Sequence, residues 1–300
     1  MSPVIVEGLR KSYGAVKAVD DVSFTVARGE VFALLGPNGA GKTTTVEILE
    51  GHRGRDGGQV SVLGFDPATG GRAYREHIGI VLQEAGFEDE FSVAELVRLY
   101  AGFYPRPRDP YEVIEQVGLQ DKRDARVRTL SGGQRRRLDL ALGLVGRPEV
   151  LFLDEPTTGF DPAARHHAWE LIDGLRASGT TILLTTHYMD EAQHLADRVA
   201  VLSAGRLVAI GSPDTLVAGE SASVLSFRLP EGTVAADLPA LAGRVEVHGP
   251  VVSVETRRPA ADMHALTGWA LDRGTELASL TLTRPSLEDV YLDLVSEATS

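Results

Sequence analysis

Short apolar runs alternate with polar and helix-forming stretches from Val4 to about Gly211. The runs rich in β-branched and large apolar residues are VIVEGL, VSFTVA, VFALLG, IGIVLQ, EVLFLDE, TILLTTH and RVAVLSAGRLVAIG. Because strands that alternate with helices build largely parallel sheets, this pattern predicts an α/β fold. Three of the runs end directly in polar clusters, and the ligands of such sheets gather at the carboxyl ends of strands.

The segment 92–147 changes to helical periodicity. SVAELVRLYAGFY and DPYEVIEQVGL have apolar residues at the spacing of amphipathic helices, so we expect a helical insertion over about 92–147. GSPDTLVAGESAS then has the composition of a boundary. The rest of the chain predicts β-α-β-β-α-β and a closing helix, with helices over 235–243, 259–274 and 285–297. The sequence therefore predicts an α/β domain over 1–218 and a small α+β domain over 219–300.

Composition narrows the class of protein. The chain has 300 residues, and its 43% apolar content is enough for a sizeable core. No run approaches the 18 or so apolar residues of a spanning helix, and the start MSPVIVEGLRKSYG lacks the features of a signal peptide. The absence of cysteine excludes disulfides, thiolate metal sites and a catalytic thiol. We expect a protein of the cytoplasm that does not itself insert into a membrane.

The charge balance bears on the kind of partner. A formal charge of -12 argues against general nucleic-acid binding, which needs a positive surface. The run Arg135, Arg136 and Arg137 is either a basic patch or the solvent-exposed face of a helix. The overall charge favours the exposed face, and we expect no nucleic-acid partner.

GPNGAGKTT, from Gly36 to Thr44, follows the apolar run VFALL and precedes the helical TTTVEILEG. The loop matches G-x-x-x-x-G-K-[ST] at Gly36, Gly41, Lys42 and Thr43. Glycines let the backbone N–H groups of Gly39–Thr43 approach a phosphate, and the start of the helix adds positive potential. Lys42 supplies a point charge, and Thr43 offers a hydroxyl to Mg²⁺. The alternative is a glycine-rich turn that binds nothing.

VLFLDEP ends a buried run with two adjacent acids, Asp154 and Glu155. Nucleotide hydrolysis needs a carboxylate for Mg²⁺ and a group that orients or activates water. Desolvating two carboxylates is costly unless a cation or hydrogen bonds compensate. We therefore expect Asp154 to act on Mg²⁺ and Glu155 to face the γ-phosphate. The alternative is a strand exit with two solvated acids.

LSGGQ, from Leu130 to Gln134, is a second glycine loop at the start of a helix. The hydroxyl of Ser131 and the N–H groups of Gly132 and Gly133 form a possible γ-phosphate site. The alternative is an ordinary helix start with Ser131 as its N-cap. Because the loop lies on the expected helical insertion, one chain cannot easily close both glycine loops on a single ligand.

These motifs together resemble the ATP-binding subunits of ABC transporters. GPNGAGKTT matches the family's Walker A loop, LSGGQ its signature motif, VLFLDEP its Walker B strand and GFDP its D-loop, with Asp161. Tyr13 resembles the residue that stacks on adenine, Gln83 in IGIVLQE the Q-loop residue, and His187 in TTHYMDEA the switch histidine. Phe160 departs from the usual leucine of the D-loop, which we expect to alter packing more than chemistry.

Three of these positions keep an alternative interpretation from their sequence context alone. His187 follows TILLTT and is either a γ-phosphate contact or a histidine buried at a strand end. Tyr13 is either the adenine platform or a loop residue that packs locally. Gln83 either links the magnesium site to a docked partner or is a surface amide.

The resemblance implies a P-loop NTPase fold and hydrolysis of ATP with Mg²⁺. In this family two ATP-binding subunits dimerise head to tail, and each ATP lies between the Walker A loop of one and the signature loop of the other. The implied catalytic residues are Glu155 and His187, and the implied Mg²⁺ ligands are Thr43, Gln83 and Asp154. The implied ATP-binding residues are Tyr13, Gly36, Asn38, Gly39, Gly41, Lys42, Thr43, Thr44 and Gln83. The residues that act on the partner's ATP are Ser131, Gly132, Gly133 and Gln134.

TTHYMDEA, the segment SGGQRRRLDLALGLVGRPEVLFLDEPTTG and the tail RPSLEDVYLDLV resemble bacterial exporters of the daunorubicin-resistance type. That resemblance implies a separate multi-span permease, contacted near Glu84 to Phe91, at the cytoplasmic face of the membrane, and export of a drug or other small hydrophobic compound. The competing hypothesis is a soluble ABC-type ATPase of translation or DNA repair. One copy of each motif and the lack of cysteine argue against it. The C-terminal domain is interpreted as a dimer brace, a sensor or a docking piece.

Overall fold

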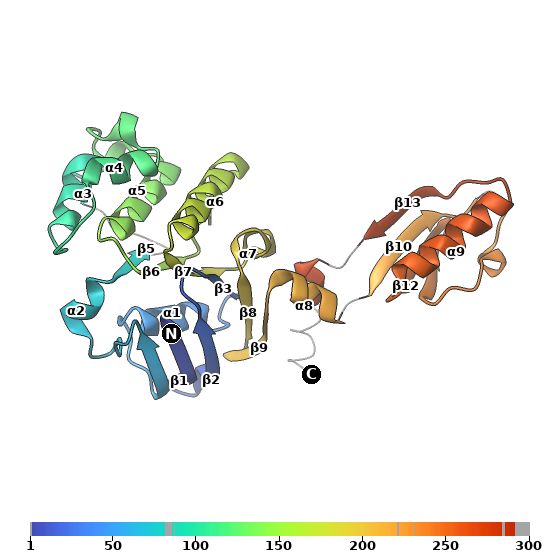
Figure 1. Ribbon diagram of the computed structural model, residues 1–300, viewed down its shortest axis with the longest axis horizontal. Coiled ribbons are helices and arrows are strands. Elements are labelled where there is room, and N and C mark those ends of the chain that lie inside the picture. The colour runs from blue at the N-terminus through green and yellow to red at the C-terminus, as the bar shows by residue number, and fades with distance from the viewer. Residues whose placement is uncertain are drawn as a thin grey trace. The chain divides into compact units, whose positions relative to one another are not determined.

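The computed structural model describes residues 2–81, 86, 88–220, 222–230, 232–283 and 286–291. The chain divides into two compact units, Met1–Pro213 and Asp214–Ser300 (Figure 1). The division falls at the start of helix α8 (Pro213–Glu220), slightly earlier than the boundary that the sequence predicts. Among the described residues, no helix is long and apolar enough to cross a membrane.

The centre of the first unit is a six-stranded sheet in the order β5-β6-β7-β3-β8-β9. All its pairs are parallel except β8 with β9, which confirms the predicted α/β class. Helices α6 and α7 follow β6 and β7 along the chain. The bounds are β3 (Val31–Leu35), β5 (Ile78–Val81), β6 (Val150–Asp154), α6 (Pro162–Ala177), β7 (Thr181–Thr186), α7 (Met189–Leu195), β8 (Arg198–Ser203) and β9 (Arg206–Gly211).

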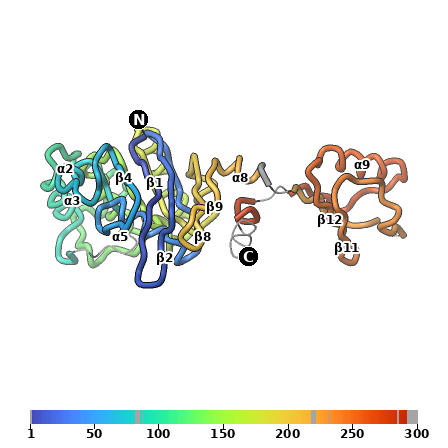
Figure 2. Tube along the Cα trace, turned by 90° about the horizontal axis from the view of Figure 1, so that it is seen from below, coloured from blue at the N-terminus to red at the C-terminus, as the bar shows by residue number. Residues whose placement is uncertain are grey.

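A second, antiparallel sheet in the order β2-β1-β4 covers the first. Figure 1 shows β1 and β2 as a hairpin at one side of the unit, and Figure 2 shows the same long hairpin from below. Helix α1 contacts strands of both sheets, and the rings of Phe24 and Phe32 stack across them with centroids 5.1 Å apart. The shared core therefore fixes the start of α1 against the central sheet. The bounds are β1 (Val4–Tyr13), β2 (Val16–Val26), α1 (Lys42–Leu49) and β4 (Gly57–Val62).

Helices alone connect β5 to β6 in the described residues, as the sequence predicts for 92–147. Figure 1 shows α3, α4 and α5 grouped on the side of the unit opposite β1 and β2. Helix α5 lies against β5, where a Cβ on Gly79 would come within 2.2 Å of the Gly143 carbonyl oxygen. The absence of that atom lets α5 approach the sheet closely. The bounds are α2 (Gly71–Arg75), α3 (Val93–Ala101), α4 (Pro110–Gln116) and α5 (Gly132–Leu144), with 3₁₀ turns at Gln120–Lys122 and Val127–Thr129.

The second unit is a four-stranded antiparallel sheet, in the order β11-β12-β10-β13, with α9 packed on one face. The core beneath α9 contains Leu225, Phe227, Val252, Val254 and Leu266. The bounds are β10 (Ser223–Arg228), β11 (Arg244–His248), β12 (Val251–Thr256), α9 (Pro259–Asp272) and β13 (Ala278–Thr283).

Two predicted helices of this unit have different outcomes. The helix predicted over 235–243 is wrong, because only a 3₁₀ turn forms at Ala235–Asp237. Pro239 explains the difference, since proline disfavours the helical conformation of the residue before it. Of the closing helix predicted over 285–297, residues 287–291 are helical, and 292–300 lie outside the described residues.

Candidate functional site

The glycine loop Gly36–Thr44 joins β3 to α1 and is held by its own backbone geometry. Gly41 has φ 99°, and a Cβ there would lie 2.3 Å from the carbonyl oxygen of Ala18. Any other residue would therefore be strained as well as blocked. Position 41 is fixed as glycine, which sets the path of the loop into the first turn of α1.

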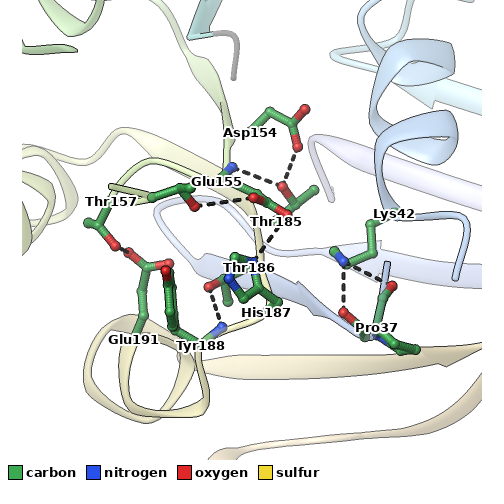
Figure 3. A network of polar contacts seen from close by, with 12 residues as sticks. Pro37, Lys42, Asp154, Glu155, Thr157, Thr185, Thr186, His187, Tyr188 and Glu191 are labelled. Carbon is green, nitrogen blue, oxygen red and sulfur yellow. Dashed lines mark hydrogen bonds and ion pairs between the residues drawn. The ribbon is translucent and has the colours of Figure 1, made fainter. Parts of the chain in front are cut away.

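Lys42 is a buried cation, with only 4% of its surface exposed. Its Nζ donates to the carbonyl oxygens of Gly36, at 2.7 Å, and Pro37, at 3.2 Å (Figure 3). Burial lowers the pKa of Lys42, and the nearby carboxylates of Glu155 and Asp154 oppose that shift. The loop therefore presents a positive charge whose hydration has already been removed.

Asp154 and Glu155 lie at the carboxyl end of β6, and both are largely buried. In the parallel register Asp154 stands beside Thr185 of β7, whose hydroxyl donates to Asp154 Oδ1. Burial raises the pKa of the Asp154 carboxyl, and the Thr185 hydrogen bond partly offsets the rise. A cation bound beside this buried carboxyl would lower its pKa again, because the cation stabilises the charged form.

Glu155 continues from β6 in a left-handed backbone conformation, with φ 48°. Its N–H donates to Thr185 Oγ1 at 3.0 Å, and its Oε2 accepts a hydrogen bond from Thr158 at 3.1 Å. His187, directly after β7, places Nδ1 3.2 Å from Glu155 Oε1 (Figure 3). The structure thus brings Asp154, Glu155 and His187 together at one edge of the sheet, as the motifs predict.

An open pocket of about 530 Å³ lies over the glycine loop. Tyr13 stands at its rim, 42% exposed, with the cationic groups of Lys11 and Arg53 within 6 Å of its ring centre. The pocket is lined by seven of the nine residues that the sequence assigns to ATP. Gly36 is not among the described lining residues, and Gln83 lies outside the described residues. Its described lining residues are Tyr13, Val16, Ala18, Asn38, Gly39, Gly41, Lys42, Thr43, Thr44 and Glu155.

The LSGGQ loop opens α5 elsewhere in the same unit. Ser131 is the N-cap, and its Oγ accepts from Gln134 N at 3.3 Å while Gln134 Oε1 accepts from Ser131 N at 2.9 Å. Ser131, Gly133 and Gln134 line a separate cavity of about 420 Å³, together with Asp161, the N-cap of α6. None of the described lining residues of this cavity belongs to Gly36–Thr44. One chain therefore keeps its two glycine loops in different pockets.

The expectation of a solvent-exposed basic face is wrong most clearly for Arg136, and Arg137 is also partly buried, with its Nη1 donating to Gly118 O at 3.0 Å. Arg135 pairs with Asp89 and is partly exposed, whereas the side chain of Arg136 is 13% exposed. Helical spacing explains the burial of Arg136, because Arg136 lies on the same face of α5 as the buried Leu140 and Gly143, at i+4 and i+7. A sequence reading that follows the α5 face instead of the RRR run could have found it.

Sequence reasoning also missed three buried hydrogen bonds at or beside the acids. The Thr185 hydroxyl donates to Asp154 and accepts from the Glu155 N–H. The only sign of this role in the sequence was a threonine near the end of the apolar run TILLTT. Thr157 Oγ1 donates to Glu191 Oε1 at 2.7 Å, and Glu191 has a pKa raised by burial. These contacts connect the segment after β6 to β7 and α7.

Comparison with known proteins identifies the family. The family described as ABC transporter matches residues 19–158, and the family described as ABC transporter domain-containing protein-like, C-terminal domain, matches residues 223–286. The chain is 39% identical to a daunorubicin resistance ATP-binding protein of Streptomyces coeruleorubidus, over 98% of this chain and 96% of that protein. It is 40% identical to a Nod factor export ATP-binding protein of Ralstonia nicotianae, over 98% and 94%.

A solved structure from Clostridium perfringens, described as part of an ABC transporter complex, has the same fold. It is 31% identical and aligns with a TM-score of 0.66 over 73% of this chain and 91% of that one. These relatives favour a transporter subunit over a soluble ATPase of translation or DNA repair. The chain therefore belongs to the ABC transporter family, as an ATP-binding subunit that hydrolyses ATP.

Proposed function

We propose that two copies of this chain dimerise head to tail around two ATP molecules and drive a separate membrane permease. The observation that supports this most directly is the division of the glycine loops between two pockets of one chain. If the LSGGQ loop binds a phosphate, that phosphate belongs to a ligand outside its own chain's nucleotide pocket. The second copy supplies one, with the Ser131–Gln134 loop of each chain facing the ATP held by the other.

In this proposal the Gly36–Thr44 loop binds the phosphates. Its glycines leave backbone N–H groups free of side chains, and Lys42 already donates to two carbonyl oxygens that phosphate oxygens can replace. Tyr13, exposed at the pocket rim, offers an aromatic face for the adenine. Asn38, Gly39 and Thr44 complete the wall of the same pocket.

Asp154 and Thr43 fit a Mg²⁺ ion that accompanies ATP. Mg²⁺ prefers oxygen ligands and keeps several waters, so one carboxylate and one hydroxyl near the phosphates suffice. The raised pKa of Asp154 marks a buried carboxyl that lacks enough compensating positive charge. The ion, when bound, neutralises charge on the phosphates. Gln83 is assigned to the same role by the sequence motif alone.

Glu155 is the group that we assign to the attacking water. One carboxylate oxygen accepts from Thr158 and the other lies beside His187, so the carboxylate has a defined orientation. In that position it can orient a water molecule and accept its proton, while His187 contacts the γ-phosphate side of the site. Asp161 caps α6 beside the signature loop and orders the segment that faces the partner.

We assign the chain to export at the cytoplasmic face of the membrane, through its permease. The support is similarity over nearly the whole chain to a daunorubicin resistance protein and to Nod factor export proteins. A drug or other small hydrophobic compound is the proposed cargo. The permease contact is assigned near Glu84 to Phe91, of which 84, 85 and 87 lie outside the described residues.

The lack of cysteine allows a direct test of the two-chain site. Asn38→Cys and Ser131→Cys are made in separate, differently tagged chains, mixed, and treated with a short bismaleimide in the presence of Mg-ATP. The head-to-tail dimer predicts an ATP-dependent cross-link between the two variants, and little between identical ones. Equal cross-linking without nucleotide, or a link only within an Asn38→Cys/Ser131→Cys double variant, would overturn the arrangement.

The transport assignment has a separate test. Co-expression with a multi-span protein encoded beside the gene should give a complex that copurifies in detergent. Daunorubicin should then stimulate ATP hydrolysis by the complex, and Lys42→Ala should abolish the stimulation. Stable association without any drug response would restrict the cargo proposal while leaving the permease assignment in place.

A further inference from the structure

Arg136 crosses from α5 to the end of β6 and contacts three successive carbonyl oxygens. Its Nη2 donates to Asp154 O at 2.7 Å and Glu155 O at 3.0 Å, and its Nε donates to Pro156 O at 3.1 Å. Its Nη1 lies 3.4 Å from Asp139 Oδ2 on the next turn of α5. A single guanidinium therefore holds the backbone on both sides of Glu155.

The backbone at Glu155 needs such support. Three consecutive carbonyls do not converge on one donor group in a regular strand, where they alternate in direction. They converge here at Glu155, with φ 48°, a left-handed conformation that is unfavourable for a residue with a Cβ. Thr185 fixes the N–H side of Glu155, and Arg136 fixes the carbonyl side.

The position of Arg136 on α5 connects this support to the signature loop. Ser131 caps the same helix, so Arg136 lies less than two turns from the residue assigned to the partner's ATP. Beside Arg136 the 420 Å³ cavity separates α5 from the apolar side of α6, where Leu171 and Ile172 line it. The Arg136 guanidinium thus connects α5 to the end of β6 by hydrogen bonds, beside a cavity in the packing of the unit.

We infer that Arg136 is a positioning residue for hydrolysis, which holds the left-handed turn that aims Glu155 and couples that turn to the helix of the signature loop. The inference rests on the proposed role of Glu155 in the ATP site. Arg136 contacts the backbone oxygens around Glu155 and the Asp139 carboxylate of its own helix, so we infer that it acts on chemistry by positioning Glu155. A change in the tilt of α5 reaches the same chain's Glu155 through these three hydrogen bonds.

The test is Arg136→Lys in the full-length chain, with Arg135→Lys as the matched control one residue away on the exposed side. Lysine keeps the charge but replaces the planar fork by a single ammonium, which cannot serve three carbonyls in the same geometry. We expect kcat to fall roughly 10- to 100-fold, as for a misaligned reacting group, with KM and ATP affinity within about 2-fold. The control should change none of these values.

A second measurement separates positioning from support of the signature loop. If Glu155 is misaligned but the loop is intact, Arg136→Lys should accumulate as an ATP-bound dimer on size-exclusion chromatography, as Glu155→Gln does. Unchanged turnover, or loss of the ATP-bound dimer together with turnover, overturns the inference. Arg136→Gln, which keeps amide donors, is measured in the same way if the lysine variant is unstable; failure of both to fold would make Arg136 a structural residue only.

Controls keep this inference separate from the proposed function. Wild-type turnover, its loss in Lys42→Ala and the dimer of Glu155→Gln are measured beside the Arg136 variants. If any of these three fails, the assigned ATP site is wrong. If all three hold and only the Arg136 variants depart from expectation, the role of Arg136 alone is wrong.

Discussion

The two glycine loops of the first unit look alike in sequence and differ in what surrounds them. Gly36–Thr44 is backed by charges of its own chain, with Lys42 buried and the acids Asp154 and Glu155 close enough to affect its pKa. The LSGGQ loop has an exposed Ser131 whose hydrogen bonds are used to cap its own helix. The first loop is therefore surrounded by buried charges of both signs from its own chain. The second loop is an exposed, capped helix start.

That difference indicates where each loop's chemistry is completed. A loop surrounded by buried charges of both signs is organised for a ligand before the ligand arrives, which lowers the reorganisation needed on binding. A capped, exposed helix start has no such setting until another surface covers it. Changes in the first loop should therefore act in a single chain, and changes in the second only when two chains meet.

The largest expected effect is that of Lys42→Ala. Removing a buried charge that faces the phosphates should lower turnover by at least about 10²- to 10³-fold, and it should weaken nucleotide binding by the monomer. The variant should remain folded, because the backbone at Gly41 sets the path of the loop and the Lys42 side chain does not. A coupled ATPase assay and differential scanning fluorimetry measure the two effects.

Lys17→Ala is the control for this experiment. Lys17 is exposed and pairs with Asp20 at 3.4 Å, so its removal should leave turnover and binding unchanged. If Lys42→Ala retained turnover, Lys42 would have no role in hydrolysis. The contrast between a charged Gly36–Thr44 loop and an uncharged LSGGQ loop would then have no functional meaning.

The second effect comes from Glu155→Gln, which keeps the shape of the side chain but removes the carboxylate. Loss of a general base or water-orienting group should slow hydrolysis by about 10²-fold or more. ATP then persists, so with Mg-ATP the variant should elute as a dimer on size-exclusion chromatography and without nucleotide as a monomer.

Adding Ser131→Arg to Glu155→Gln sharpens the contrast between the loops. In the proposed dimer the bulky side chain lies where the partner's γ-phosphate approaches, so the dimer should disappear, while ATP binding by the monomer survives. Filter binding or fluorescent-ATP titration measures the monomer. If the double variant also lost monomer binding, LSGGQ would hold its own chain's nucleotide, and the two loops would form one site.

Much of the fold follows from local sequence, and the exceptions have physical causes. The central strands are continuous apolar runs, and each predicted run of the first unit contains a strand in the described residues, the run RVAVLSAGRLVAIG containing two. β4 was missed because GGQVSV places only Val60 and Val62 inward, which is too little alternation to separate it from a loop. The helix predicted over 235–243 failed because a periodicity count gives no weight to the proline at 239.

The site divides in the same way. The positions of residues within contiguous motifs, such as Lys42 at the start of α1 and Asp154 at the end of β6, were predictable because the motif places them next to an apolar run. Thr185 was not, since its contact with Asp154 depends on the register between β6 and β7. The burial of Arg136 could have been predicted from helical spacing, but its partners could not, since they are carbonyls 18 to 20 residues away and backbone oxygens leave no mark in the sequence.

A smaller effect is expected from Thr185→Val, which keeps the shape but removes the hydroxyl shared by Asp154 and Glu155. The loss of such a supporting hydrogen bond should lower turnover roughly 10-fold and stability by about 1 to 2 kcal/mol. The hydroxyl lowers the pKa of Asp154, so its loss should raise that pKa and move the acid limb of the pH–rate profile to higher pH.

Thr185→Ser retains the hydroxyl and should restore both the rate and the position of the acid limb. Chemical denaturation and the pH–rate profile are the measurements. A rate loss in valine and serine variants alike would point to packing in β7 as the cause, and the acids at the sheet edge would then need no support from this side chain.

The smallest effect is expected from removal of the second unit, by ending the chain after Gly219. Every described lining residue of the nucleotide pocket, and of the cavity beside the LSGGQ loop, lies in the first unit. That unit contains its own core between two sheets. ATP affinity of the truncated chain should therefore stay within about 2-fold of the full chain, since no charge or hydrogen bond of the pocket is removed. Circular dichroism first establishes that the truncated chain is folded, and fluorescent-ATP titration then compares the affinities.

A folded chain that no longer bound ATP would mean that the second unit completes the Gly36–Thr44 site, so that neither loop is self-sufficient. A chain that bound ATP normally but, with Glu155→Gln, no longer dimerised would place the second unit on the side of the signature loop, as a brace for the surface that two chains share.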